Sequence, residues 1–514
     1  MRQVLNIFVK DVRHLRVEIL IALAVVAAQA LLGPSQWAVQ GPQAEATQTD
    51  VMRMASNLLV PITLIAWALL IAQAVHAEPL VGDRQFWITR PYAWKKLLAA
   101  KLIFFTLFIY LPFFLLQCVL LAEAGFPPPH WIPRVLLTLL LISASVILPM
   151  IAIASVTSNI GRRVLVLVGV LFYWLIIQAV SALQGQMIKP SIYISPVPLR
   201  EYLIDLLLFS ACSLVVVLQY RTRRTLLSRV LLIAALVLCG AIGFVVPDRL
   251  LMDRNYPRAG NQSAVPFQVS FAANRADTQL QSWRGAPGDR IGIPLRFTGI
   301  AEGSTISVDA VSATFEAHNG ARWTSGWQTQ ADLINFAQGV TVPQMLITIP
   351  NWVYSKLKDG PVGVHLTLAT TEMMAGRAFE MQLPQPMQEF SVPGVGICKP
   401  QVGFSGDAQA LACRFPFQAP LTYVSTRRFD QPCSQSQTDP GVEGSGWVGT
   451  LNSNAPGPSF FPVVYPAFPL SNRMQQTTNG QQPRNLCPGT PVTFIPYQLV
   501  RRMQTTITVQ DFHL

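Results

Sequence analysis

Apolar residues are distributed very unevenly along this chain. Before residue 247 they form runs of about 20 residues, the length that an α-helix needs to cross the hydrocarbon core of a bilayer. Beyond residue 248 no such run occurs, and short segments of alternating apolar and polar residues replace them. The pattern predicts a membrane domain of α-helices over 1–247. Its expected spans cover residues 17–35, 56–77, 102–123, 135–156, 164–184, 202–220 and 227–247.

The region after residue 247 is predicted to be mostly β, with the architecture of a β-sandwich. Apolar residues alternate in Arg290–Phe297 and again in Val362–Leu368, which is typical of half-buried strands. A change near Pro393 to sequence richer in Cys and Pro predicts two parts, 248–394 and 395–514. One short helix is expected over 352–357, and further strands over 266–273, 304–316, 343–349, 377–383, 459–465, 492–496 and 504–511.

The distribution of charge predicts how the chain is oriented. The formal net charge is +12, and most of the excess lies in the membrane half, which has 19 Lys and Arg against 9 Asp and Glu. The rest of the chain has 19 Lys and Arg against 17 Asp and Glu. A cytoplasmic N-terminus puts 15 of those cations on inner segments and 4 on outer loops, as the positive-inside rule requires. We therefore expect a multi-pass protein of the bacterial inner membrane whose C-terminal region is periplasmic or extracellular. Cations beside apolar segments meet anionic lipid, so no nucleic-acid partner is expected.

The cysteines agree with this orientation. Four of the seven fall in the region expected outside, and an even number in an oxidising compartment predicts two disulfides. Of the three possible pairings we predict the nearest neighbours, Cys398–Cys413 and Cys433–Cys487. A zinc site is the rival interpretation, but no pair has the close spacing of such sites. The remaining three act as small apolar residues within spans: Cys118, Cys212 and Cys239.

Residues 2–16 have the periodicity of an amphipathic helix. Leu5, Phe8, Val12 and Leu15 form one apolar stripe, and the cations of the segment lie largely off it. Such a helix favours a position along the inner face of the membrane. A cytoplasmic extension of the first span would have the same periodicity, so both interpretations stay open.

The loop between the second and third spans, residues 78–101, is the most distinctive part of the sequence. It mixes charges with four aromatic residues: Phe86, Trp87, Tyr92 and Trp94. Pro91 disfavours the α conformation at Arg90, which predicts a short helix over about 81–89 that ends before the third span begins. Aromatic residues among charges favour a docking surface. An aromatic belt at the membrane interface has the same composition, and the residues alone do not decide between the two.

This loop resembles the one that follows the second span in type-2 ABC exporter permeases. Those proteins typically show a Glu, a Gly four residues later, an apolar pair, Thr-x-Pro, and a Leu-rich run that ends in Lys. The same order occurs here in Glu78, Gly82, Phe86-Trp87, Thr89-Arg90-Pro91, Leu97-Leu98 and Lys101. Asp83 departs from the pattern, since Thr or Ser is common there. The family also has an amphipathic first helix and six core spans, so the resemblance extends over about residues 1–225.

The resemblance implies that the loop is a coupling helix seated in a groove of a separate ATP-binding subunit. Glu78, Phe86 and Arg90 are the expected principal contacts. It also implies a dimer with a second copy or a homologous permease, and ATP–Mg bound by the partner rather than by this chain. The full set of implied coupling residues is Glu78, Gly82, Asp83, Arg84, Phe86, Trp87, Thr89, Arg90 and Pro91.

Missing motifs agree with a subunit that depends on a partner. The chain lacks the G-x-x-x-x-G-K-[ST] loop that binds ATP phosphates and the H-E-x-x-H motif of zinc proteases, so we expect no enzymatic activity, catalytic residue, metal or cofactor. Glu201 and Asp205 lie one helical turn apart at the outer end of the sixth span. They are interpreted either as anchors at the membrane interface or as part of an outer vestibule. Three prolines are candidates for kinks in spans two to four: Pro61, Pro112 and Pro149.

Two functions remain after these observations. The first is a permease subunit of an ATP-driven exporter with an added extracytoplasmic β domain. The alternative is a membrane-anchored sensor or assembly scaffold, whose β domain binds a ligand or partner without transport.

Overall fold

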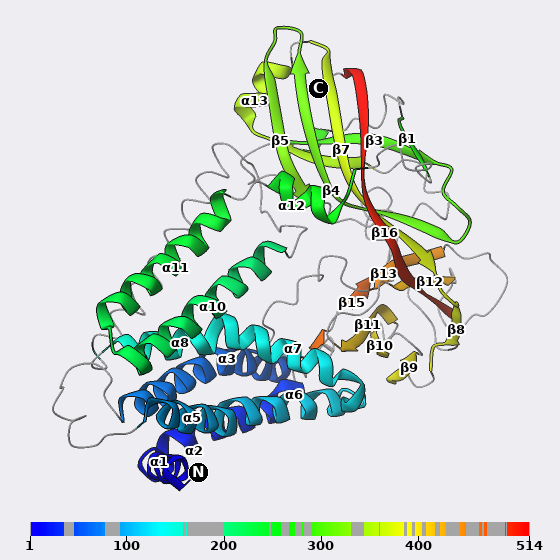
Figure 1. Cartoon of the computed structure of the whole chain (residues 1–514). Coiled ribbons are helices and arrows are strands. Elements are labelled where there is room, and N and C mark those ends of the chain that lie inside the picture. Colours follow the sequence, from blue (N-terminus) through cyan, green and yellow to red (C-terminus); the bar gives the residue numbers. More distant parts are fainter. Residues whose placement is uncertain are drawn as a thin grey trace.

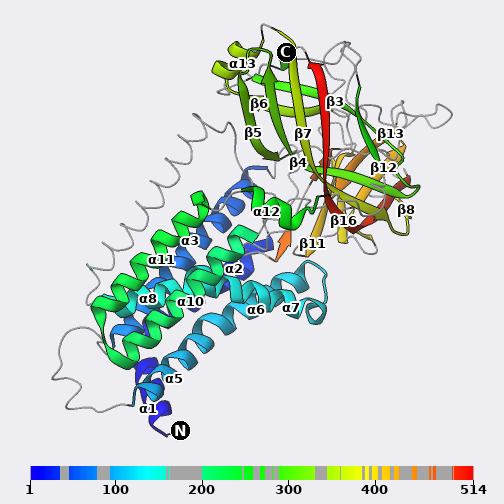
Figure 2. The same ribbon diagram turned by 45° about the horizontal axis from the view of Figure 1, so that its top comes forward.

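The computed structural model shows a bundle of helices with a β-rich body at one end, and helix α1 with the N-terminus at the other (Figures 1 and 2). Everything below concerns the residues that the structure describes: 2–34, 46–77, 93–157, 161, 199–245, 248–258, 267–272, 280–281, 289–329, 344–358, 360–384, 388–392, 396–402, 408–416, 422–427, 443–448, 462–464, 467–469, 489 and 491–512.

The helical part contains several segments long and apolar enough to cross a membrane. Among the described residues five meet this condition, and a sixth is added if α1 and α2, which are bent by 75° at their junction, count as one span. These agree with six of the expected spans, while the span expected over 164–184 lies outside the described residues. The helices are α1 Arg2–His14, α2 Arg16–Leu32, α3 Ala46–His76, α5 Trp94–Phe105, η2 Thr106–Tyr110, α6 Leu111–Glu123, η3 Pro128–Trp131, α7 Ile132–Ile142, η4 Ser143–Ile147, α8 Leu148–Val156, α10 Leu199–Thr222, α11 Thr225–Val245 and α12 Asp248–Asn255.

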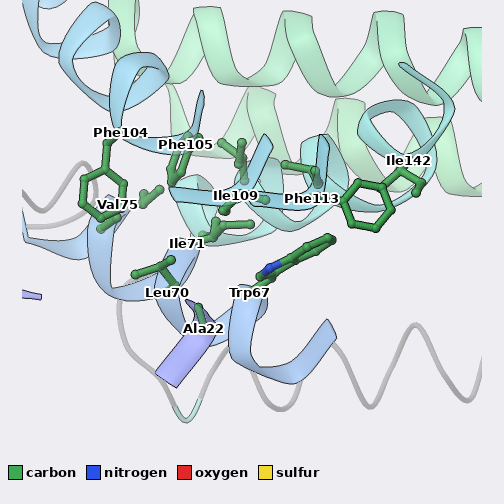
Figure 3. Packing of buried hydrophobic residues seen from close by; sticks show 14 of the residues in the cluster. Ala22, Trp67, Leu70, Ile71, Val75, Phe104, Phe105, Ile109, Phe113 and Ile142 are labelled. Carbon is green, nitrogen blue, oxygen red and sulfur yellow. The ribbon is translucent and has the colours of Figure 1, made fainter. Parts of the chain in front are cut away.

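The centre of the bundle is packed with aromatic and branched side chains. Trp67 of α3 is fully buried and meets Phe113 of α6 edge to face, with ring centroids 5.5 Å apart (Figure 3). Outward-facing leucines such as Leu69, Leu102 and Leu136 are exposed instead. Apolar residues on both the inside and the outside are what a bundle surrounded by lipid requires, so the chain is a multi-pass membrane protein.

The third and fourth spans each contain one π-helical segment, η2 and η4. A proline follows each of them at the second position of the next helix, Pro112 in α6 and Pro149 in α8. A proline ring crowds the carbonyl one turn earlier and donates no hydrogen bond, and the wider π turn relieves that crowding. The hydroxyls of Tyr110 and Ser143 lie 2.6 Å apart and join the two π segments. Helix α3, in contrast, runs through Pro61 without such a segment.

The β-rich region has three sheets. One has β16 and β7 at its centre, in the order β13-β12-β16-β7-β4-β5 with β8 beside β16; the second is β1-β3-β2 with β6 beside β3; the third is β14-β11-β10-β9 with β15 beside β11. The strands are β1 Gln268–Phe271, β2 Leu280–Gln281, β3 Asp289–Thr298, β4 Ser304–Ala317, β5 Arg322–Thr329, β6 Gln344–Ile349, β7 Val362–Ala375, β8 Phe379–Gln382, β9 Phe390–Val392, β10 Gly396–Val402, β11 Ala408–Pro416, β12 Thr422–Arg427, β13 Glu443–Val448, β14 Val463–Val464, β15 Ala467–Pro469 and β16 Pro491–Phe512, and helix α13 covers Asn351–Leu357.

Two of these sheets pack face to face around one apolar core. Ile293 of β3 and Ile347 of β6 meet Phe315 of β4 and Leu366 of β7 there, all fully or almost fully buried. Alternate residues of these strands point into this core because successive side chains of a strand face opposite sides. This two-layered packing follows the alternation predicted from the sequence.

Pairing by the last strand joins segments that are distant in the sequence. β16 pairs with β7 from Tyr497–Ala375 to Phe512–Val362, so the seven-stranded sheet includes strands from both sides of the division expected near residue 395. The strands predicted over 492–496 and 504–511 are one continuous strand rather than two, a correction that follows from the long partner strands available to it. Several strands were not predicted, because pairing with neighbouring strands stabilises them more than a pattern of their own: β2, β5, β9, β10, β11, β12, β13 and β15.

Candidate coupling site at the α1 end of the bundle

The predicted coupling loop is described only through the helices at its two ends. Its predicted contact residues, from Glu78 to Pro91, all lie outside the described residues. The second predicted disulfide, Cys433–Cys487, also lies outside them. Helix α3 ends at His76 just before the loop, and α5 begins at Trp94, so that its first two turns form the last part of the loop. The site is therefore described here from these two helices and the elements that hold them.

Helix α1 packs against α5 along a face that agrees with the predicted stripe except at Leu5. Leu5, a member of that stripe, is 61% exposed, whereas Ile7 and Asp11 are buried. Phe8 and Val12 are partly buried, as predicted, so the packed face is rotated toward Ile7. On this face the surface of α5 offers Lys101, which pairs with the buried Asp11.

The bend between α1 and α2 bears on the choice that the sequence left open. A cytoplasmic extension of the first span would continue the axis of α2, but the two helices meet at 75° around Leu15. The cations of α1 remain on its exposed side: Arg2, Lys10 and Arg13. Helix α1 is thus a separate amphipathic helix across the end of the bundle.

A buried ion pair joins α1 to the third span. Lys101 Nζ donates a hydrogen bond of 2.7 Å to Asp11 Oδ2, and the two side chains are 1% and 0% exposed. Burying either charge alone costs several kcal/mol, roughly, so each residue depends on the other. Phe8 adds ring contacts with Phe104 and Phe108 of the same span, at centroid distances of 6.4 and 6.2 Å. The lysine that ends the loop pattern is therefore one half of the contact that fixes α1.

The helix before the loop is fixed in a different way, at the C-terminal end of α8. His76 Nε2 lies 3.0 Å from the carbonyl oxygen of Ala154, and Arg229 of α11 donates to that of Val156 through Nη2 at 3.0 Å and Nε at 3.2 Å. The last carbonyls of a helix lack partners within it and carry partial negative charge, which suits basic side chains. These bonds bring together the ends of α3, α8 and α11.

The same end of the bundle carries many exposed cations. Besides those of α1, they include Lys95, Lys96, Arg221, Arg223 and Arg224. Lys95 Nζ lies 5.7 Å from the centre of the Trp94 ring, a cation–π arrangement at the start of α5. A basic surface of this kind can contact anionic lipid or an acidic face of a partner protein.

The cysteines provide a further test of the sequence predictions. Cys398 and Cys413 form a disulfide between β10 and β11, as predicted. The three cysteines of the membrane helices are free thiols: Cys118, Cys212 and Cys239. Among the residues that the structure describes, no group of three or more His, Cys, Asp or Glu side chains could hold a metal ion.

Sequence reasoning overlooked the role of Asp11. The available signal was an acidic residue beside the apolar stripe of a basic helix, together with Lys101 inside the apolar run of the third span. Each is a charge in an apolar setting, which indicates a buried partner of opposite sign. Which two charges would meet depends on how α1 crosses α5.

No protein-family model matches this chain, and no curated protein matches its sequence. The interpretation of the site therefore depends on its residues and geometry.

Proposed function

We propose that this chain is the membrane-spanning permease subunit of an ATP-driven exporter, and that its 78–101 loop receives the movement of a separate ATP-binding subunit. The observation that carries the proposal is the buried Asp11–Lys101 pair. A loop that relays force must be attached firmly where it meets the helices. His76 on one side and Lys101 on the other supply such attachments.

The other parts of the proposal follow from this role. The N-terminus and the α1 end of the bundle face the cytoplasm, and the β region is periplasmic or extracellular. The exposed cations at the α1 end suit anionic inner-leaflet lipid around the docked subunit. ATP and Mg²⁺ are bound by the partner, this chain has no enzymatic activity of its own, and two permease subunits form the membrane part.

A membrane-anchored sensor or scaffold is the second candidate. It is supported by the size of the β region, whose own apolar core is independent of the helices. In a sensor the loop would bind no ATPase, which gives the two candidates different expected outcomes in one experiment.

The experiment is an affinity pull-down of the detergent-solubilised protein. Wild type is compared with a Glu78→Ala, Phe86→Ala, Arg90→Ala variant of the loop. The matched control changes the same three kinds of residue on the exposed surface of the β region: Glu302→Ala, Trp352→Ala and Arg322→Ala.

We expect an ATP-binding subunit to be recovered with wild type and with the control, and to be lost with the loop variant. Recovery of no ATPase with properly folded wild type would lead us to abandon the exporter and favour the sensor. Equal recovery with all three proteins would place the contact outside these three loop residues.

A further inference from the structure

The third span connects the two ends of the molecule. Helices α5 and α6 and the π segment between them form one apolar helix from Trp94 to Glu123, 30 residues long. Near its first end this helix holds Asp11 of α1 through Lys101. At its other end it leads into the short turn around Gly125 and Phe126, which precedes the fourth span.

That turn is in direct contact with the β region. A Cβ atom on Gly125 would lie 2.3 Å from Ile397 Cδ1, so strand β10 occupies the space where a side chain would otherwise be. Gly125 also has a φ of 87°, which favours glycine on conformational grounds. A Cβ on Gly396 would lie 3.4 Å from Phe126 Cζ, a second close approach between the same two segments. Figures 1 and 2 both show β11, the partner of β10, near the end of the bundle where α6 and α7 meet.

The hairpin that makes this contact is covalently closed. Ile397 pairs with Arg414 in the β10–β11 ladder, directly beside the Cys398–Cys413 disulfide. Both cysteines are buried. A displacement of Ile397 is therefore passed to β11 rather than absorbed by separation of the two strands.

A second attachment joins the β region to the last span. Helix α12 begins just beyond the end of α11, and its Leu251 and Met252 are buried in a cluster with Ala310 and Ala369 of the large sheet. The hydroxyl of Tyr256, next after α12, donates a 2.8 Å hydrogen bond to Asp309. Gln504 Nε2 of β16 donates a 3.0 Å bond to Asp253 Oδ1. The β region is thus held on the bundle at two separated places.

We propose that the third span is a mechanical link between α1 and the β region, with the β10–β11 hairpin as the surface that receives its movement. The β region is then a body docked on two spans and displaced with them. This inference concerns contacts within the chain and does not require an ATPase, so it stands or falls independently of the proposed function.

The experiment measures the outer contact while the inner one is changed. The full-length protein in lipid nanodiscs carries the photoreactive residue p-benzoyl-phenylalanine in place of Phe126, and mass spectrometry quantifies cross-links to residues 396–416. The yield is compared in the otherwise wild-type protein, in Lys101→Met, in the charge-neutral double variant Asp11→Asn, Lys101→Met, and in the control Lys95→Met, which changes an exposed lysine of the same helix.

We expect a clear cross-link in the otherwise wild-type protein and no change with Lys95→Met. Lys101→Met should lower the yield by about two- to tenfold, within the range of coupling between distant sites, and the double variant should restore most of it. Absence of the cross-link in the otherwise wild-type protein would overturn the contact. An equal yield in Lys101→Met and Lys95→Met would overturn the link through the span.

A further variant guards against failure of Lys101→Met to fold. Phe8→Ala removes the ring contacts of α1 with Phe104 and Phe108 without leaving a charge unpaired. It should lower the cross-link yield in the same direction by a smaller factor, and an unchanged yield would again contradict the mechanical link.

Discussion

The helical bundle and the β region each bury an aspartate, and they stabilise it by different means. In the bundle, Asp11 is paired with a lysine of opposite charge, at 2.7 Å. In the β region, Asp309 accepts hydrogen bonds from the hydroxyls of Tyr256 and Ser307, at 2.8 and 2.9 Å, and from Thr371. The first arrangement cancels a charge, whereas the second surrounds a carboxyl group with neutral donors.

This difference affects the protonation of the β-region carboxyl. Burial raises the pKa of Asp309 above its ordinary value, and the hydroxyl donors and the charge of Arg502 offset only part of that effect. A proton on Asp309 therefore relieves the cost of burial. Asp11 has a cation in contact, so loss of its partner leaves a full charge in an apolar interior. The bundle should be the more sensitive of the two regions to a single substitution.

The largest expected effect comes from Lys101→Met in the bundle. Breaking a buried ion pair by removing one partner costs about 3–5 kcal/mol, because the remaining charge is unpaired. We expect a pronounced fall in the midpoint of thermal unfolding, measured by fluorescence-detected size-exclusion chromatography after heating. Lys95→Met, on the exposed side of the same helix, should leave the midpoint unchanged.

The double variant Asp11→Asn, Lys101→Met separates charge from packing in this result. With no net charge left behind, it should recover most of the stability lost in Lys101→Met. A double variant as unstable as the single one would show that packing around the lysine stem, rather than the ion pair, stabilises this contact.

The next largest effect should come from the disulfide. Among the described cysteines, those of the β region form a disulfide and those of the bundle do not. Replacing both Cys398 and Cys413 with serine removes a cross-link worth about 2–4 kcal/mol. We expect faster cleavage of residues 396–416 by protease in the folded protein. Cys118→Ser, a free thiol of the bundle, is the control and should leave the cleavage rate unchanged.

Tyr256→Phe tests the hydroxyl network with a smaller change. It removes one donor to Asp309 while the ring stays in its apolar cluster, which should cost about 1–2 kcal/mol. The β region should unfold at lower urea concentration, as followed by tryptophan fluorescence. Tyr354→Phe alters a half-buried tyrosine elsewhere in the same region and should have little effect. A similar loss in both variants would contradict a specific role for the Tyr256 hydroxyl.

The smallest expected effect is a dependence of stability on pH that arises from Asp309. Because the folded state raises the pKa of Asp309 above its ordinary 3.8, folding is favoured when this group is protonated. Its contribution is complete below the ordinary pKa and is lost as the pH rises through the raised pKa. Relative to Asp309→Asn, wild type should therefore gain stability as the pH falls through that window, measured as the difference between their thermal midpoints. A difference that is constant with pH would show that folding does not raise the pKa of Asp309.

Much of the architecture was predictable because it depends on local patterns. Runs of apolar residues predicted the helices, since a bilayer requires each span to satisfy its own backbone hydrogen bonds. Alternation predicted strand β7, in which every second residue from Val362 to Leu368 is buried. Nearest-neighbour spacing predicted the Cys398–Cys413 pair. In each case the physical requirement acts within a short stretch of chain.

Only the tertiary structure decided which distant groups meet. The sequence by itself determined that the chain has apolar membrane helices and a strand-rich region, and that α1 is amphipathic. It did not determine that Asp11 would bind Lys101, 90 positions away, or that Ile397 would fill the space above Gly125. Periodicity predicts which side of an element is apolar. Which residue pairs with a buried charge, or packs against a glycine, depends on how separate elements cross in space.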